Sequence, residues 1–137
     1  MFENLANQED SDSTAVDQMS HERRMVFALN MLRQEVNSGS FDAYFRYAGG
    51  KTAPQAAEAA RIVLPGWSGL IDDACRTMGA PYPSDAESRE RVVDRVAEED
   101  PELFSNLDDR LYQLEEDDPA DEQIDRFIWS NKPAFFV

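Results

Sequence analysis

The sequence predicts an all-α fold, arranged as a single compact domain of six to eight helices, several of them short. Apolar residues recur every three or four positions in successive segments, which is the period of amphipathic helices. Gly, Pro and Asn separate these segments, and the sequence lacks strand-like alternation of useful length. The 137 residues, with 42% hydrophobic content, suffice for one domain that buries a core without disulfides or metals. We place this domain at residues 19–137 and interpret residues 1–18, with five acidic and no basic side chains, as a flexible acidic arm.

The first half of the domain is expected to contain four helices. A helix begins at Ser20 and carries an apolar stripe made of Met25, Leu29, Leu32 and Val36. We expect it to end at Gly39 with a left-handed cap residue, after which Ser40 caps a short helix at 41–47. The segment 52–55 has the form of a capping box and opens an Ala-rich helix at about 53–64. Another amphipathic helix carries a stripe from Trp67 to Met78 and stops at Gly79.

The second half of the domain is richer in charged residues. Ser84 with Glu87 forms a second capping box and opens a charged helix at about 85–98. The helical spacing of Leu107, Leu111 and Leu114 marks the next helix, and Asp118 followed by Pro119 begins the last one. The tail at 134–137 is apolar and is expected to pack against the core.

The acidic excess is confined to two segments of the chain. The net charge is −15, yet residues 21–97 carry ten acidic and ten basic side chains and are balanced. Residues 98–125 carry thirteen acidic side chains and only Arg110 as a base. Such a field repels nucleic acid phosphates and anionic lipid and attracts basic partners. We therefore expect a basic protein as partner, with no direct nucleic acid or membrane binding.

The acids of residues 98–125 are the candidate partner-binding surface. Like charges one helical turn apart destabilise a helix, so this clustering favours a functional use over a face that is acidic only for solubility. Asp108 with Asp109, and Asp121 with Glu122, are expected in first helical turns, where the helix dipole favours acids. The EF-hand spacing and its central Gly are missing, so we predict no dedicated metal site. The candidate residues are Glu98, Glu99, Asp100, Glu102, Asp108, Asp109, Glu115, Glu116, Asp117, Asp118, Asp121, Glu122 and Asp125.

The sequence offers little for catalysis. Cys75 is the single cysteine and falls on an apolar stripe, which favours a core position, and the single histidine, His21, is expected to be solvated. Asp72 and Asp73 are adjacent on a helix and point about 100° apart, so they do not converge. Gly49-Gly50-Lys51-Thr52 lacks the upstream Gly and strand of a phosphate loop. We predict a non-enzymatic protein without cofactors, located in the cytoplasm, as a lone cysteine and the lack of a signal peptide or an apolar span indicate.

Two segments resemble the signature of a bacterial all-α domain family of largely unknown function that includes a DNA-mimic protein. Glu35-Val36-Asn37-Ser38-Gly39-Ser40-Phe41, then Tyr44-Phe45, is similar to the family's Glu-x-Asn-Asn-Gly-Gly-Phe pattern and its aromatic pair. Leu107-Asp108-Asp109-Arg110-Leu111-Tyr112 resembles the family's Leu-Asp-Asp-Arg-Phe/Tyr-Tyr segment. The similarity spans about residues 25–136.

This resemblance implies an all-α fold and, for the mimic member, surface carboxylates that imitate DNA phosphates. Ser38, Ser40 and Ala43 depart from the family pattern, where Asn, Gly and Gln are common. We interpret the signature residues as structural, with a turn followed by an aromatic core plug. They are Glu35, Asn37, Gly39, Phe41, Tyr44, Phe45 and Tyr112.

Two kinds of binding function remain open beside acidity for solubility alone. In the first, the protein is a DNA mimic whose carboxylates, at roughly the 7 Å spacing of phosphates, occupy the basic surface of a partner such as a transcription regulator. In the second, it is an immunity-like or adaptor protein that recognises one partner by shape, with Trp129 or Tyr82 as anchors. Either protein is expected as a monomer or a homodimer.

Overall fold

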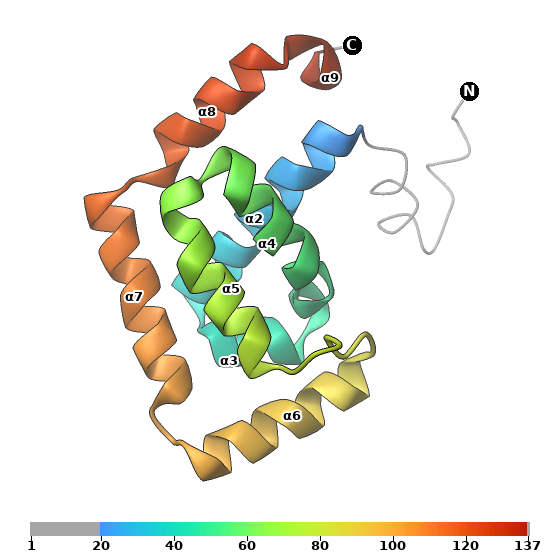
Figure 1. Cartoon of the computed structure of the whole chain (residues 1–137), viewed down its shortest axis with the longest axis vertical. Coiled ribbons are helices and arrows are strands. Elements are labelled where there is room, and N and C mark those ends of the chain that lie inside the picture. Colours follow the sequence, from blue (N-terminus) through green and yellow to red (C-terminus); the bar gives the residue numbers. More distant parts are fainter. Residues whose placement is uncertain (1–19, 137) are drawn as a thin grey trace.

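The computed structural model describes residues 20–136, and all regular secondary structure in this range is helical (Figure 1). Eight α-helices and two short 3-10 helices are found there. The predicted all-α class and helix number are confirmed. The acidic arm predicted at residues 1–18 lies outside the described residues.

The first helix, α2 (His21–Ser38), buries the apolar stripe that the sequence predicts. Ser20 caps it, because the Ser20 Oγ accepts a hydrogen bond from the backbone N–H of Arg23 at 3.2 Å. α2 ends at Gly39, but the expected left-handed conformation is wrong, since the φ of Gly39 is −140°. Gly39 takes an irregular backbone conformation between the end of α2 and Ser40, which is extended and already caps the next helix.

The short helix α3 (Phe41–Arg46) follows directly and plugs the core with aromatic rings. The Ser40 Oγ accepts from the Ala43 N–H at 3.1 Å, which confirms the predicted cap. The rings of Phe41 and Phe45 stack at a centroid distance of 5.9 Å, and both residues are fully buried. One helical turn thus supplies much of the large apolar volume at the centre of the domain.

The middle of the chain forms η2 (Ala48–Thr52), α4 (Ala53–Val63), η3 (Pro65–Trp67) and α5 (Ser68–Thr77). The predicted capping box before α4 is wrong: the Thr52 Oγ1 donates to the Gly49 carbonyl at 2.7 Å, inside η2. The chain is thus already helical at Thr52, so its hydroxyl caps nothing. α5 is followed by Gly79, whose φ of +113° suits a residue without a Cβ.

The helices α6 (Ala86–Glu99), α7 (Leu103–Asp117) and α8 (Ala120–Ser130) follow one another around the outside of α2–α5, and α9 (Lys132–Phe135) closes the chain (Figure 1). α6 packs on α3, α7 on α3 and α5, and α8 on α4. The cap of α6 is Asp85 rather than the predicted Ser84, because Asp85 Oδ2 accepts from the Ser88 N–H at 2.9 Å.

One apolar cluster joins these helices, from Met25 on α2 to Ile124 on α8. A charged side chain, Arg89 of α6, is also buried in this region, where its guanidinium donates to the carbonyls of Phe45 at 3.0 Å and Ser84 at 2.8 Å. The expected packing of the C-terminal tail is met by Phe135, which lies half-buried against the core, whereas Phe136 is 60% exposed. Val137 lies outside the described residues.

Candidate functional site

The carboxylates predicted as a binding surface lie on three consecutive outer helices. Twelve of the thirteen are exposed or half-buried on the end of α6, along α7 and on the first half of α8. We call these twelve residues the acidic arc, because α6, α7 and α8 curve around one side of the molecule (Figure 1). Its members are Glu98, Glu99, Asp100, Glu102, Asp109, Glu115, Glu116, Asp117, Asp118, Asp121, Glu122 and Asp125.

The thirteenth residue, Asp108, does not belong to the surface, and its assignment there is corrected. Asp108 is only 9% exposed, and its Oδ1 accepts a 2.7 Å hydrogen bond from the backbone N–H of Phe41 at the start of α3. Burial raises the pKa of the Asp108 carboxyl, although this hydrogen bond counteracts part of the rise. Asp108 and Asp109 also lie in the second turn of α7 rather than the first, because α7 begins at Leu103.

One end of the arc is the turn between α6 and α7. Glu98 and Glu99 occupy the last turn of α6, Asp100 is its C-cap residue, and Glu102 is the N-cap residue of α7. All four are exposed. The helix dipole disfavours carboxylates at the end of α6, so local stability does not account for their presence there.

The middle of the arc is the outer face of α7. Glu102, Asp109 and Glu116 follow one another at intervals of seven residues, which places them on one line about 10.5 Å apart. Tyr112 lies between the last two on the same face, is 40% exposed, and donates a 3.4 Å hydrogen bond from its hydroxyl to the Val36 carbonyl. The outer face of α7 therefore presents one aromatic ring among its carboxylates.

The other end of the arc is the junction between α7 and α8. Here Arg33 of α2 binds two of the carboxylates, Glu115 at 3.0 Å and Asp121 at 3.0 Å. Burial alone would lower the pKa of the Arg33 guanidinium, but these bonds outweigh it and hold the pKa above its ordinary value. Arg33 lies 82 positions from Glu115, so no local pattern in the sequence indicated this pair.

Arg110, the single base of residues 98–125, does little to neutralise the arc. Its guanidinium binds Asp73 of α5 at 3.1 Å, and Asp73 also pairs with Arg76. These two bonds, to Arg76 first and then Arg110, keep the pKa of Asp73 below its ordinary value. The positive charge of Arg110 is thus directed to the balanced part of the chain.

The signature residues mostly serve contacts inside the domain. Phe41, Tyr44 and Phe45 are fully buried, and the Tyr44 hydroxyl lies 3.1 Å from the Thr52 Oγ1. The backbone carbonyl of Glu35 accepts from the Gly39 N–H at the end of α2. Asn37 is exposed and reaches the arc, where its Nδ2 donates to the Glu115 Oε2 at 2.9 Å.

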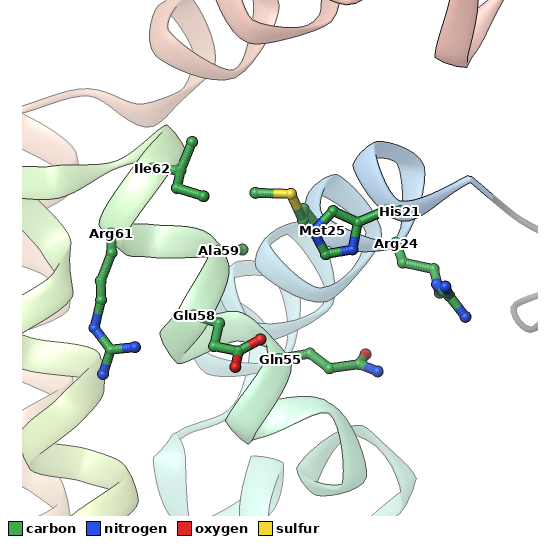
Figure 2. Close-up of a pocket in the computed structure, with 8 residues that line it drawn as sticks. All are labelled: His21, Arg24, Met25, Gln55, Glu58, Ala59, Arg61 and Ile62. Carbon is green, nitrogen blue, oxygen red and sulfur yellow. The ribbon is translucent and has the colours of Figure 1, made fainter.

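A groove of about 510 Å³ lies between α2 and α4 (Figure 2). Met25, Ala59 and Ile62 form its apolar part, and His21 and Glu58 lie at its edge. These lining residues include no hydroxyl or thiol that His21 would activate as a nucleophile. Cys75 lies elsewhere, half-buried, with burial raising the pKa of its thiol to about 12. Among the described residues, no group of three His, Cys, Asp or Glu side chains is arranged to hold a metal ion.

Comparison with known proteins identifies the family. The profile of the DMP19-like protein family matches residues 17–131, which include the signature segments and the entire acidic arc. The chain belongs to the DMP19-like family. This match confirms the resemblance that the two sequence segments indicated. No curated protein and no solved structure matched the chain.

Among the described helices of this DMP19-like chain, none is both long and apolar enough to span a membrane. The placement of charge is a separate feature of the described residues. The carboxylates of the α6–α7 turn and of the α7–α8 junction lie at opposite ends of a 15-residue helix, about 22 Å apart.

Proposed function

We propose that this DMP19-like protein binds the basic surface of a DNA-binding protein through its acidic arc and thereby keeps that protein from DNA. The observation that supports this most is the run of exposed carboxylates along α6, α7 and α8, which the bases of the same segment do not balance. The name of the family points to DNA mimicry.

The density of charge along the arc is of the same order as that of DNA. B-DNA carries one phosphate charge per about 1.7 Å of axis, so a length of about 22 Å, the span of α7, carries roughly thirteen. Six of the carboxylates of the arc, from Glu102 to Asp118, lie within this length, and three more flank it at each end, on α6 and α8. Over this length, Lys and Arg side chains that hold phosphates would therefore meet about half as many anionic groups as on DNA.

The proposal is tested by capture followed by competition. The immobilised protein is exposed to lysate of the source organism at about 50 mM salt, eluted by a salt step, and the eluted DNA-binding protein is identified and purified. Its binding to this chain should weaken by orders of magnitude between about 50 and 200 mM salt, as binding to DNA does. The chain should also displace labelled DNA from it. Binding that ignores salt, or that leaves the DNA bound, contradicts the proposal.

Matched charge variants show whether the arc carries the binding. One variant replaces four arc residues and the control replaces four acids of the balanced segment, so both lose the same net charge. We expect the arc variant to bind at least tenfold more weakly and the control to remain within threefold of the wild type. An equal loss of affinity in the arc variant and the control would indicate that overall charge, and not the arc, causes the binding. The arc variant is E116Q/D117N/E122Q/D125N, and the control is E22Q/E58Q/E87Q/E90Q.

Recognition by shape remains a second candidate because of one exposed aromatic group. Trp129 of α8 is 63% exposed, packs against Phe136 at 5.6 Å between centroids, and has the ammonium of Lys132 at 5.2 Å from its ring centre. Tyr82, the other expected anchor, is half-buried and donates its hydroxyl to the Gly50 carbonyl at 2.6 Å. If Trp129→Ala weakens binding of the captured protein more than the arc variant does, this candidate replaces the first.

A further inference from the structure

Arg33 connects the charge-balanced part of the chain, residues 21–97, to the acidic arc. Its Nε and Nη2 donate to the two carboxylate oxygens of Glu115 at 3.1 and 3.0 Å, so the pair is bidentate. Its Nη1 donates to the Asp121 Oδ1 at 3.0 Å. One guanidinium on α2 thus joins the last turn of α7 to the first turn of α8. The Arg33 side chain is only 16% exposed, which limits the number of positions open to it.

The same guanidinium lies against Trp67, which holds the α7–α8 junction by a second contact. The Arg33 Cζ lies 5.8 Å from the centre of the Trp67 ring, a cation–π arrangement. Trp67 is fully buried, and its Nε1 donates to the backbone carbonyl of Asp118 at 2.8 Å. The Asp118 carboxylate lies over Gly66, where a Cβ would require this side chain to move. The bond from Trp67 therefore holds the backbone of the α7–α8 junction close to the two carboxylates that Arg33 binds.

We propose that Arg33 is a positioning residue of the acidic arc, which sets the carboxylates of the α7–α8 junction in one arrangement before a partner binds. This inference rests on the proposed function. Arg33 places a positive charge into a surface whose negative charge attracts the partner, so its presence lowers the local charge. What it adds is order: side chains that are already fixed lose less conformational freedom on binding.

Charge and order predict opposite effects when Arg33 is changed. Arg33→Met frees two carboxylates and makes the arc more negative, so an arc that acts only through charge would bind a basic protein more tightly. Arg33→Lys keeps the charge but cannot form the planar two-pronged contact with Glu115. If the arc acts only through charge, Arg33→Lys should bind the partner with the affinity of the wild type. If Arg33 positions the arc, both variants bind more weakly.

Three variants and one control test the inference. The DNA-binding protein recovered by the capture experiment is titrated against the wild type, Arg33→Lys, Arg33→Met and Asn37→Ala, the last of which removes a single bond to Glu115. The control is Arg46→Lys, because Arg46 also binds several carboxylates, Asp42 at 2.7 Å and Asp94 at 2.8 Å among them, but on α3 and α6. We expect about tenfold weaker binding for both Arg33 variants, two- to threefold for Asn37→Ala, and wild-type binding for Arg46→Lys.

Amide hydrogen exchange at residues 115–122 tests the positioning without any partner. Exchange there should become faster in Arg33→Lys and stay unchanged in Arg46→Lys, with thermal unfolding used to choose a temperature at which every variant is folded. Wild-type affinity in Arg33→Lys, tighter binding in Arg33→Met, or unchanged exchange in Arg33→Lys would each overturn the inference. A wild-type protein that displaces no DNA refutes the proposed function instead, and the exchange measurement still decides the role of Arg33.

Discussion

Two adjacent aspartates on α7 should separate stability from binding. Asp108 accepts the Phe41 N–H at 2.7 Å in a site that is 9% exposed, whereas the neighbouring Asp109 is on the exposed face. Asp108→Ala leaves that buried N–H without an acceptor, and hydrogen bonds to a charged group contribute about 1.5–3 kcal/mol. We expect a loss of about 2 kcal/mol, or roughly 6–10 °C in the unfolding midpoint for a domain of this size. Asp109→Asn should change stability by no more than about 0.5 kcal/mol.

The binding of the same two variants should show the reverse order. Asp109→Asn removes a carboxylate from the middle of the arc, so its affinity for the captured DNA-binding protein should fall severalfold. Asp108→Ala should bind as the wild type does at a temperature where it is folded. Thermal unfolding followed by circular dichroism and titration of the partner make the comparison. The reasoning is refuted if Asp108→Ala is as stable as the wild type, or if the two variants lose affinity equally.

Three further predictions concern groups inside the domain. Because burial raises the pKa of Asp108, the wild type loses stability as the pH rises through that pKa, whereas Asn at this position does not titrate. The free energy of unfolding of Asp108→Asn, measured with urea, should therefore rise relative to that of the wild type between pH 3 and pH 7. With its pKa near 12, the half-buried Cys75 thiol should react with iodoacetamide at pH 8 far more slowly in the native protein than in urea, and equal rates would contradict its placement. Trp67→Phe replaces the fully buried indole by a smaller ring and loses the 2.8 Å bond to the Asp118 carbonyl. The lost bond and the cavity together should cost about 2–3 kcal/mol in the free energy of unfolding measured by urea.

The helices could be predicted from the sequence because their signals are local. The stripe of α2 and the break at Gly79 depend on residues within a few positions of one another, and both appear in the structure. Helix caps were predicted less well where two polar residues compete. Ser84 and Asp85 both suit an N-cap, and the structure uses Asp85. The choice between them depends on where the loop before α6 ends, and a local sequence pattern does not specify that position.

The members of the acidic arc were predicted from composition, but the contacts that order it were not. Charge counting shows that residues 98–125 hold an excess of acids, and it treats every acid alike. The contact between Arg33 and Glu115 joins residues 82 positions apart, and it exists only because α2 and α7 pack together. A count along the chain thus predicts how much charge there is, while tertiary packing decides which carboxylates are held and which are buried.

The apolar periodicity of the sequence nevertheless indicates which charged side chains make contacts inside the fold. Asp108 lies in the stripe that Phe104, Leu107 and Leu111 define on α7, at a position where an apolar residue is expected. Arg33 and Arg89 stand in the same relation to the stripes of α2 and α6. A charged side chain at such a position is brought against the core, where leaving it unpaired is costly. Each of the three makes bonds to distant parts of the chain: the Phe41 backbone N–H for Asp108, the Phe45 carbonyl for Arg89, and two carboxylates of the arc for Arg33. Charged residues within an apolar stripe therefore mark three of the long-range polar contacts of this fold, and Arg33 is the one of these three whose contacts reach the proposed binding surface.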